Sequence, residues 1–210
     1  MGEIATPETI GSDLAACKNA FDQIGIPWVI IDGVALGFAK IKKILPGDTD
    51  LDFGVFVELS NKQWKNLIMS LAKNQFKIKA RNSGKGDFKT LHRKSKSNMW
   101  LYHKNGEFYE SFPFSTPGLK FVEKVKWYDN PQIVDFLGKN YLVPNYLEDY
   151  IECHYGKKWR EKTYTHGEWR VEKFGTLDQS VKIGQKIWLE SRCGKNGDLW
   201  PKIMNIGDEL

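Results

Sequence analysis

The sequence predicts an α+β fold, in which a mixed β-sheet is flanked by helices. In the first third of the chain, apolar residues recur at helical spacing in three segments, and two short apolar stretches between them have the length of strands. The middle third changes to strand-like stretches. The pair Asn105-Gly106 between two of these is typical of a tight β-hairpin of type I′, because both residues tolerate a positive φ. Helices alternating with strands, followed by a run of strands, indicate an α+β domain.

Element boundaries follow from residues that start or stop regular structure. Ser12 or Thr9 can cap the first helix and Gly25 ends it, and Asn145 and Gly156 bracket the last helix in the same way. The expected helices cover residues 9–24, 34–44, 61–74 and 145–155, and the expected strands cover residues 27–31, 51–59, 76–80, 88–93, 99–103 and 108–112.

The chain has the length and composition of one globular domain. Its 210 residues are 41% hydrophobic and 27% charged, which is near the average for folded proteins. We expect residues 1–160 to form the main domain and residues 161–210 to form a helical or irregular C-terminal extension packed on the same domain.

Charge and cysteine content narrow the choice of partners and of environment. The 31 Lys and Arg residues exceed the 26 Asp and Glu residues and give a formal charge of +5, which either favours an anionic partner or is a generic basic surface. The three cysteines form no Cys-x-x-Cys pair, so a reducing, cytoplasmic location is expected. No apolar run is long enough to span a bilayer, so we expect no transmembrane segment.

Three aspartates alternate where the second strand is expected to begin. Residues two apart in a strand share a face, so Asp48, Asp50 and Asp52 would converge while Leu51 and Phe53 enter the core. A divalent cation relieves the repulsion among such carboxylates, and oxygen ligands suit Mg²⁺ or Mn²⁺. The alternative is an acidic turn in which aspartates bond to the backbone. The alternation into an apolar strand favours the metal site.

A glycine turn upstream is the second candidate for binding chemistry. A strand that ends at Gly33 and runs into a helix exposes the backbone N–H groups of Gly33 and Val34 at a helix N-terminus, where a phosphate is stabilised. Lys40 lies about one and a half turns further on and either reaches the same phosphate or is an ordinary solvated lysine.

Other candidates for contacting a ligand carry a weaker signal. His92 and Arg93 lie near the expected loop at residues 84–86 and can meet phosphate, although a surface strand of mixed charge explains them equally well. Tyr155 and Trp159 can stack on a base, but we favour a role in which they anchor the last helix in the core.

Several of these segments resemble motifs of the LicD/fukutin family and occur in the family's order. Asp32 to Gly37 resembles its Gly-Thr-Leu-Leu-Gly turn, and Leu45 to Phe53 resembles its Ile-Pro-Trp-Asp-Asp-Asp-Ile-Asp segment. Tyr109 to Pro113 is similar to its Asp-hydrophobic-Phe-Pro strand. Tyr141 to Pro144, followed by Tyr155 to Trp159, is similar to its Val-Pro and Tyr-Gly-x-x-Trp signature. The resemblance covers most of the expected main domain.

The resemblance implies a nucleotidyltransferase fold and a metal-dependent phosphotransferase. In that superfamily two aspartates and a carboxylate from a neighbouring strand bind the metal, which here implies Asp50, Asp52 and Glu110 with Mg²⁺ or Mn²⁺. The implied reaction moves phosphocholine or a phospho-alditol from a CDP-linked donor to a hydroxyl of a glycan or polyol-phosphate acceptor and releases CMP. Asp48 or Glu110 would take the acceptor's proton, and we favour Asp48 because Glu110 is needed as a ligand.

The chain departs from the family's motifs at several positions. Val34 stands where the family has Thr or Ser, which removes a hydroxyl from the expected phosphate site, and Lys40 stands where Arg is usual. Glu110 replaces Asp and lengthens one ligand. The remaining departures are Gly47, Thr49 and Ser111, in place of Trp, Asp and a hydrophobic residue.

Two other functions are compatible with the residues. A nucleotidyltransferase that adds a nucleotide to RNA or to a small molecule would release pyrophosphate and not CMP. A non-catalytic nucleic-acid-binding domain is less favoured, and it would bind oligonucleotides with strong salt dependence and no effect of metal.

Overall fold

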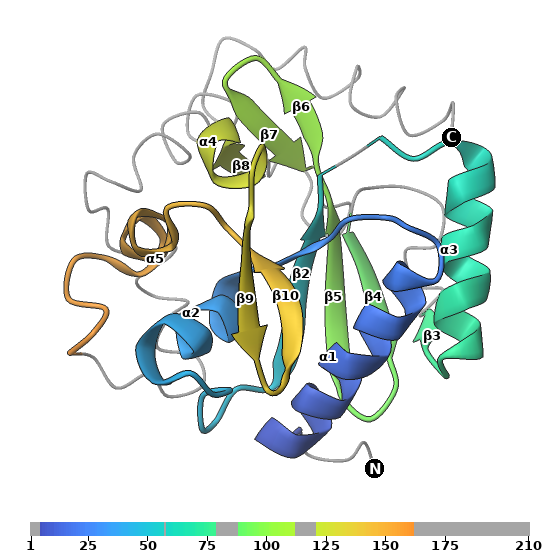
Figure 1. Ribbon diagram of the computed structural model, residues 1–210, viewed down its shortest axis with the longest axis horizontal. Coiled ribbons are helices and arrows are strands. Elements are labelled where there is room, and N and C mark those ends of the chain that lie inside the picture. Colours follow the sequence, from blue (N-terminus) through green and yellow to red (C-terminus); the bar gives the residue numbers. More distant parts are fainter. Residues whose placement is uncertain (1–4, 57, 79–87, 112–120, 162–210) are drawn as a thin grey trace, which may run out of the picture.

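The computed structural model describes residues 5–56, 58–78, 88–111 and 121–161, which form β-sheets flanked by helices and confirm the predicted α+β class (Figure 1). Residues 162–210, most of the expected extension, lie outside the described residues, as do the loop at 84–86 and Phe112. The helices are α1 (Pro7–Asp22), α2 (Asp32–Ile41), α3 (Asn61–Lys73), α4 (Val125–Tyr128) and α5 (Leu147–Tyr155). The strands are β1 (Val29–Ile30), β2 (Asp50–Val55), β3 (Lys77–Ile78), β4 (Phe88–His92), β5 (Lys96–Leu101), β6 (His103–Asn105), β7 (Phe108–Ser111), β8 (Phe121–Lys124), β9 (Gln132–Phe136) and β10 (Lys139–Val143).

A five-stranded mixed sheet positions the predicted site. Its strand order is β1-β2-β5-β4-β3, in which β2 runs parallel to β5 and the other neighbours are antiparallel. Along β2, the side chains of Leu51, Phe53 and Val55 are fully buried. Asp50 and Asp52 alternate with these residues and are only partly buried. The period of two that the sequence predicts for this strand is therefore present.

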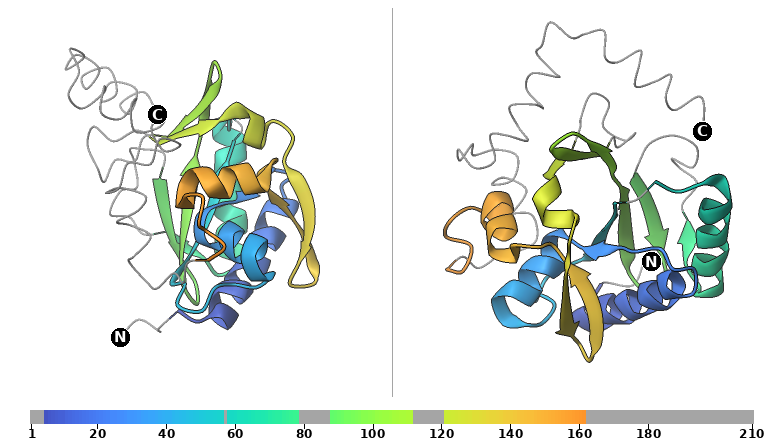
Figure 2. Two further views of the ribbon diagram at one scale, coloured as in Figure 1. Left: turned by 90° about the vertical axis from the view of Figure 1, so that its left-hand side faces the viewer. Right: turned by 45° about the horizontal axis from the view of Figure 1, so that its top comes forward.

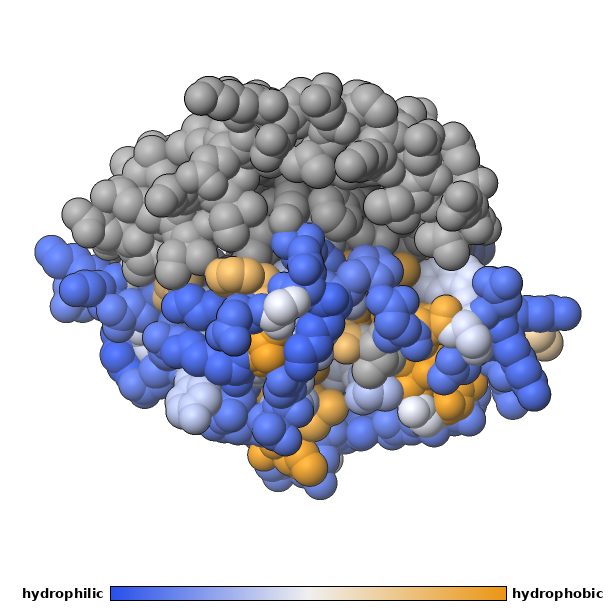
Figure 3. All heavy atoms as spheres, turned by 90° about the horizontal axis from the view of Figure 1, so that it is seen from above, coloured by the Kyte–Doolittle hydropathy of each residue, from blue (hydrophilic) through white to orange (hydrophobic). Residues whose placement is uncertain are grey.

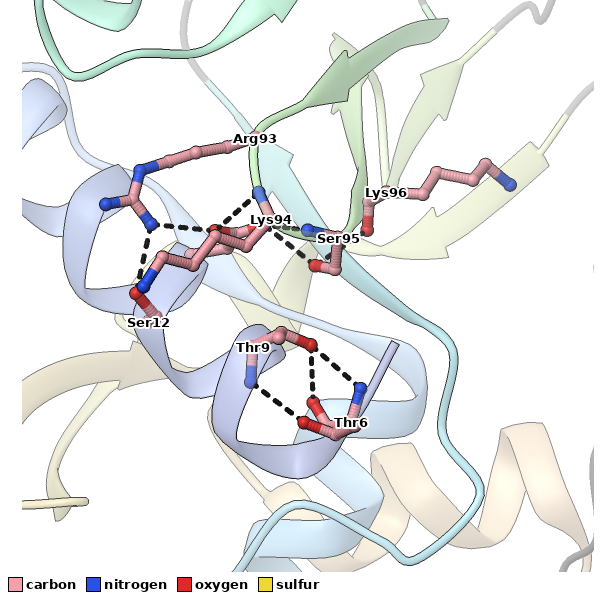
Figure 4. A network of polar contacts seen from close by, with 8 residues as sticks. Thr6, Thr9, Ser12, Arg93, Lys94, Ser95 and Lys96 are labelled. Carbon is pink, nitrogen blue, oxygen red and sulfur yellow. Dashed lines mark hydrogen bonds and ion pairs between the residues drawn. The ribbon is translucent and has the colours of Figure 1, made fainter. Parts of the chain in front are cut away.

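The start of α1 differs from the prediction. Thr6 is the N-cap, and its hydroxyl accepts the backbone N–H of Thr9 while the Thr9 hydroxyl accepts the N–H of Thr6, which completes a capping box (Figure 4). Pro7 occupies the first helical turn, where its missing N–H is not needed. The expectation that Ser12 or Thr9 is the N-cap is wrong, because both residues lie inside the helix, Thr9 as its third residue.

Turn residues shift two other predicted boundaries. In the β6–β7 hairpin Asn105 pairs with Phe108, so the turn residues are Gly106 and Glu107, and Gly106 alone of these has a positive φ, of 58°. The hairpin is confirmed, but its expected type I′ turn at Asn105-Gly106 is wrong. The last helix begins at Leu147, because Tyr146 adopts a left-handed φ of 50°, and it ends before Gly156 as expected.

Residues 121–143 contain elements that the sequence pattern did not predict. The strand β8 joins β6 and β7 in a three-stranded sheet, and β9 pairs with β10 in a separate hairpin. Apolar and polar residues do not alternate clearly along β9, where Ile133 and Val134 are adjacent and Ile133 is 72% exposed. Its tip, Leu137-Gly138, has positive φ at both residues, a geometry that Leu rarely adopts and that sequence rules therefore do not indicate.

An aromatic cluster joins the N-terminal helix, the sheet and the β9–β10 hairpin. The ring of Phe53 on β2 lies 5.6 Å from Phe21 of α1 and 5.2 Å from Trp28, both edge to face. Trp28 also contacts Tyr141 of β10 at 6.1 Å. Edge-to-face pairs of this kind stabilise a core beyond the area that they bury. Elements distant in sequence are thereby fixed around β2.

The face of the described part that Figure 3 shows is largely polar. In the view of Figure 3, hydrophilic residues predominate among those in colour, with small hydrophobic areas between them. No helix within the described residues has the length and apolar character needed to cross a membrane.

A buried aspartate ties α1 to the turn between β4 and β5. Asp13 is fully buried. Its Oδ1 binds the Arg93 guanidinium at 2.9 Å, and its Oδ2 accepts the N–H of Ser95 at 2.7 Å and the Ser95 hydroxyl at 2.8 Å. Arg93 also donates to the Ser12 hydroxyl (Figure 4). This network replaces the hydration that the carboxylate loses on burial.

We expect Asp13→Ala to lower the free energy of unfolding by about 3–5 kcal/mol, because it leaves the Arg93 charge in a largely buried position without its partner. The matched control is Asp22→Ala on the same helix. Asp22 pairs with Lys18 in solvent, and such a pair contributes about 0–1 kcal/mol. Urea titration of both variants tests this, and equal losses would contradict a special role for Asp13.

Candidate functional site

The turn between β1 and α2 lies directly beside β2. Ile31 donates its N–H to the carbonyl of Asp52 at 3.2 Å, and Asp32 then begins α2 with a left-handed φ of 51°. This sharp change of direction leads straight from strand to helix. The N-terminal turn of α2, with Gly33 and Val34, is thereby brought to the strand that carries the aspartates. The predicted boundary is wrong, because Gly33 already lies in the helix and does not end the strand.

Asp50 and Asp52 converge on one side chain. The Asn98 amide nitrogen on β5 donates to Asp50 Oδ2 at 2.8 Å and to Asp52 Oδ1 at 3.0 Å. The parallel register sets Asp52 opposite Asn98, so the amide lies between the two carboxylates. Two acids that share one donor must lie close together, and the predicted pairing of these residues is present in the structure.

Two further residues of β5 surround this pair. Lys96 places its ammonium 3.3 Å from Asp50 Oδ2, and the indole N–H of Trp100 lies 3.4 Å from Asp52 Oδ1. Lys96, Asn98 and Trp100 are not among the residues that the sequence predicts for the site. Their spacing of two along an expected strand was the available signal, but the register with β2 was needed to interpret it.

Asp48 occupies a different position from the one predicted. It precedes β2, in the turn after Gly47, and does not continue the alternation of the strand. Its carboxylate packs on the glycine turn, where a Cβ added to Gly33 would lie 2.8 Å from Asp48 Oδ2. Burial, then the charge of Asp50, raise the pKa of Asp48 to about 7. Its Oδ2 is buried and has no hydrogen-bond partner among the described residues.

Glu110 lies apart from the aspartate pair. It is buried on β7, opposite His103 of β6 and Val122 of β8. The residue opposite Asp52 is Asn98 of β5, whereas Glu110 pairs with His103 of β6, in a different sheet. Among the described residues, no three His, Cys, Asp or Glu side chains are arranged to hold a metal ion. The predicted third ligand is not brought to the pair.

The predicted phosphate-binding residues of α2 differ in accessibility. The Val34 side chain is fully buried, so only its backbone can face a ligand. Lys40 lies at the other end of α2, and its ammonium donates to the Trp159 carbonyl at 3.3 Å. This contact joins α2 to the segment after α5. Gly37 is needed for close packing, because a Cβ there would lie 2.5 Å from the Lys43 carbonyl.

The remaining predicted residues lie in structural positions. Arg93 binds Asp13, as described above. His92 lies on β4, where its backbone is opposite Lys96 of β5 and Lys77 of β3. Tyr155 and Trp159 are buried in the core, at 5% and 2% exposure. This burial agrees with the interpretation that they anchor the last helix.

The chemistry of the aspartate pair fits a hard divalent cation. Mg²⁺ in proteins is held by one or two carboxylates, and its other positions are completed by water and by substrate phosphates. Asp50 and Asp52 could supply the two carboxylates. The buried, unpartnered Oδ2 of Asp48 and Oδ1 of Asn98 are further oxygen atoms in the same neighbourhood. The donor set is therefore entirely composed of oxygen.

Comparison with known families gives one match over more than half of the chain. The family described as LicD/FKTN/FKRP, nucleotidyltransferase domain, matches residues 25–146. No curated protein matches the chain.

Two solved structures have a similar chain path. The antibiotic-resistance factor ANT(2")-Ia in complex with adenylyl-2"-tobramycin has a TM-score of 0.47 and 9% identity over 94% of this chain and 96% of its own. The lincosamide antibiotic adenylyltransferase LnuA with bound lincomycin has a TM-score of 0.46 and 11% identity over 89% of this chain and 98% of its own.

Replacement of Asp48 distinguishes a crowded acidic site from a capped turn. Asp48 Oδ1 accepts the N–H of Thr49 at 3.0 Å, and loss of a capping aspartate lowers stability by about 0.5–2 kcal/mol. Relief of repulsion with Asp50 acts in the opposite direction. We expect Asp48→Asn to leave the free energy of unfolding unchanged or to raise it, measured by urea titration in chelator at pH 8. A loss of about 1 kcal/mol or more would identify a capping residue.

Proposed function

Because this chain belongs to the LicD/FKTN/FKRP family and is a transferase of the nucleotidyltransferase fold, we propose that it moves a phosphorylated group from a CDP-linked donor to a hydroxyl acceptor and releases CMP. The proposed group is phosphocholine or a phospho-alditol, and the proposed acceptor is a glycan or a polyol phosphate. The proposal requires a divalent cation, Mg²⁺ or Mn²⁺.

The observation that carries the proposal is the convergence of Asp50 and Asp52 on Asn98, beside the glycine turn. When bound at this pair, a divalent cation would neutralise the diphosphate of the donor and the charge of the departing CMP. Asn98 fixes the orientation of both carboxylates. Residues that orient ligands in this way contribute to metal affinity although they do not bind the metal themselves.

The start of α2 supplies the complementary part of a nucleotide site. The first turn of a helix has backbone N–H groups without partners in the helix and the positive end of its dipole, and both stabilise a phosphate. The N–H groups of Gly33 and Val34 lie in this turn. Lys96 lies beside the pair and adds positive charge to the same region. The residues thereby bind and orient the anionic donor.

Asp48 is the proposed proton acceptor for the attacking hydroxyl. A general base works best when its pKa is near the working pH, and burial and Asp50 raise the pKa of Asp48 to about 7. Its Oδ2 has no hydrogen-bond partner among the described residues, so its capacity to accept a proton is not already used. Asp50 and Asp52, which donors from β5 already engage, are less suited to this role.

A product assay separates the proposal from the rival functions. Purified protein would be incubated with CDP-linked donors, Mn²⁺ and polyol or glycan acceptors, and the released nucleotide identified. Metal-dependent CMP release supports the proposal. Pyrophosphate release from a nucleoside triphosphate would identify a nucleotidyltransferase instead. Metal-independent, salt-sensitive binding of oligonucleotides without turnover would indicate a nucleic-acid-binding domain.

We expect Asp50→Asn and Asp52→Asn each to lower kcat/KM by at least about 100-fold, because 2.7 kcal/mol of lost charge stabilisation corresponds to that factor. Asp135→Asn on the exposed side of β9 serves as the control. A second readout is the melting temperature, since ligand at a hundredfold excess over Kd stabilises by about 2.7 kcal/mol. Mn²⁺ with CDP should stabilise the wild type and Asp135→Asn but neither site variant.

Glu110→Gln tests the third carboxylate that the family resemblance implies. Although Glu110 does not join the aspartate pair among the described residues, the proposal retains this role because the family resemblance implies it, and on that ground we expect Glu110→Gln to remove activity as Asp50→Asn does. Glu107→Gln, in the exposed turn of the same hairpin, should retain full activity. Full activity of Glu110→Gln would agree with the place of β7 in a separate sheet and would leave a site of two aspartates.

A further inference from the structure

Three titratable side chains, one buried and two mostly buried, lie in contact with one another outside the aspartate pair. His154 on α5 lies between two carboxylates, with Nε2 3.1 Å from Glu123 Oε2 and Nδ1 3.6 Å from Asp32 Oδ1. The exposed fractions of the His154, Glu123 and Asp32 side chains are only 11%, 6% and 14%. The Tyr128 hydroxyl also donates to Glu123 Oε2, at 3.4 Å. The contact with Glu123 fixes the imidazole from the side opposite Asp32.

Asp32 is contacted twice from α5. Its backbone N–H donates to the Tyr150 hydroxyl at 3.0 Å, and its carboxylate lies beside His154. Tyr150 and His154 are four residues apart, so they stand one above the other on a single face of the helix. Their rings lie 4.2 Å apart. In two views α5 lies next to α2, the helix that Asp32 begins (Figure 2).

The conformation of Asp32 needs such support. Its φ of 51° lies in the left-handed region, which a residue other than glycine occupies only when its surroundings fix it there. The next residue is Gly33, against which the Asp48 carboxylate packs. A contiguous path of contacts therefore runs from Glu123 through His154 and Asp32 to the glycine turn.

We propose that His154 and Tyr150 are positioning residues that hold the Gly33 turn, through Asp32, in the conformation that binds the phosphates of a nucleoside diphosphate. The ligand class rests on the proposed function, whereas the control of the turn by α5 does not. Neither residue contacts the ligand in this proposal, so both act through the backbone of α2.

One amide signal reports directly on the turn. Asp32-Gly33 is the only Asp-Gly pair in the sequence, so protein labelled with carbonyl-¹³C aspartate and ¹⁵N glycine gives a single carbonyl-filtered amide resonance, that of Gly33. We would record it for full-length wild type, His154→Gln and Tyr150→Phe. The Tyr150→Phe variant keeps the buried ring and removes only the hydroxyl, so it decides the question if His154→Gln does not fold.

The matched control is Glu148→Gln. Glu148 lies on the same helix, and the substitution breaks its exposed ion pair with Arg160. We expect the Gly33 resonance to shift or to split in His154→Gln and Tyr150→Phe and to stay unchanged in Glu148→Gln. An unchanged resonance in the folded variants would overturn the proposal, and so would an equal change in the control.

Affinity for CDP in the presence of Mn²⁺ tests the functional part. If the loosened turn has the binding conformation about one tenth of the time, the apparent Kd rises about tenfold. Equal Kd values for the wild type and the variants, despite a shifted resonance, would overturn the link to binding. A wild type that binds no CDP would contradict the proposed function, whereas the Gly33 resonance would still decide whether α5 controls the turn.

Discussion

The pairing of β1 with β2 is the constraint on which the candidate site depends. Only two residues of β1 take part, Val29 opposite Gly54 and Ile30 opposite Phe53. The following N–H, of Ile31, binds the Asp52 carbonyl. Because the strands are antiparallel, the chain leaves β1 at the point where the carboxylates of β2 begin. The helix start and the acids are therefore neighbours by backbone geometry, before any side chain contributes.

Close packing restricts two positions of α2 to glycine. A side chain at position 33 would collide with Asp48, and one at position 37 with the carbonyl of Lys43. The two glycines thus allow the loop after α2 to fold back across its helix and bury Asp48. The raised pKa of Asp48 follows from this arrangement, since burial is its largest cause and the charge of Asp50 is the next.

The predictable part of the site was the part encoded locally. The period of two in residues 50–53 and the glycine turn are visible within a few residues, so sequence patterns could identify both. Asn98 lies 46 residues from Asp52, and its role follows only from the parallel register of β2 and β5. For the same reason the sequence allows Arg93 either to contact phosphate or to lie on a charged surface strand, because its partner Asp13 lies 80 residues away on α1. Contacts between strands and helices that are distant in the chain could not be predicted from a single sequence.

The contacts of Asp32 extend the functional unit beyond the matched family domain. The match ends at residue 146, just before α5. However, Tyr150 and His154 of α5 contact the first residue of α2, and Lys40 at the end of α2 binds the Trp159 carbonyl after α5. The helix that carries the proposed phosphate-binding turn is thus held at both ends by one segment, which contains α5 and Trp159. A strained residue at the start of α2 requires this support, so the matched residues by themselves do not contain everything that fixes their own site.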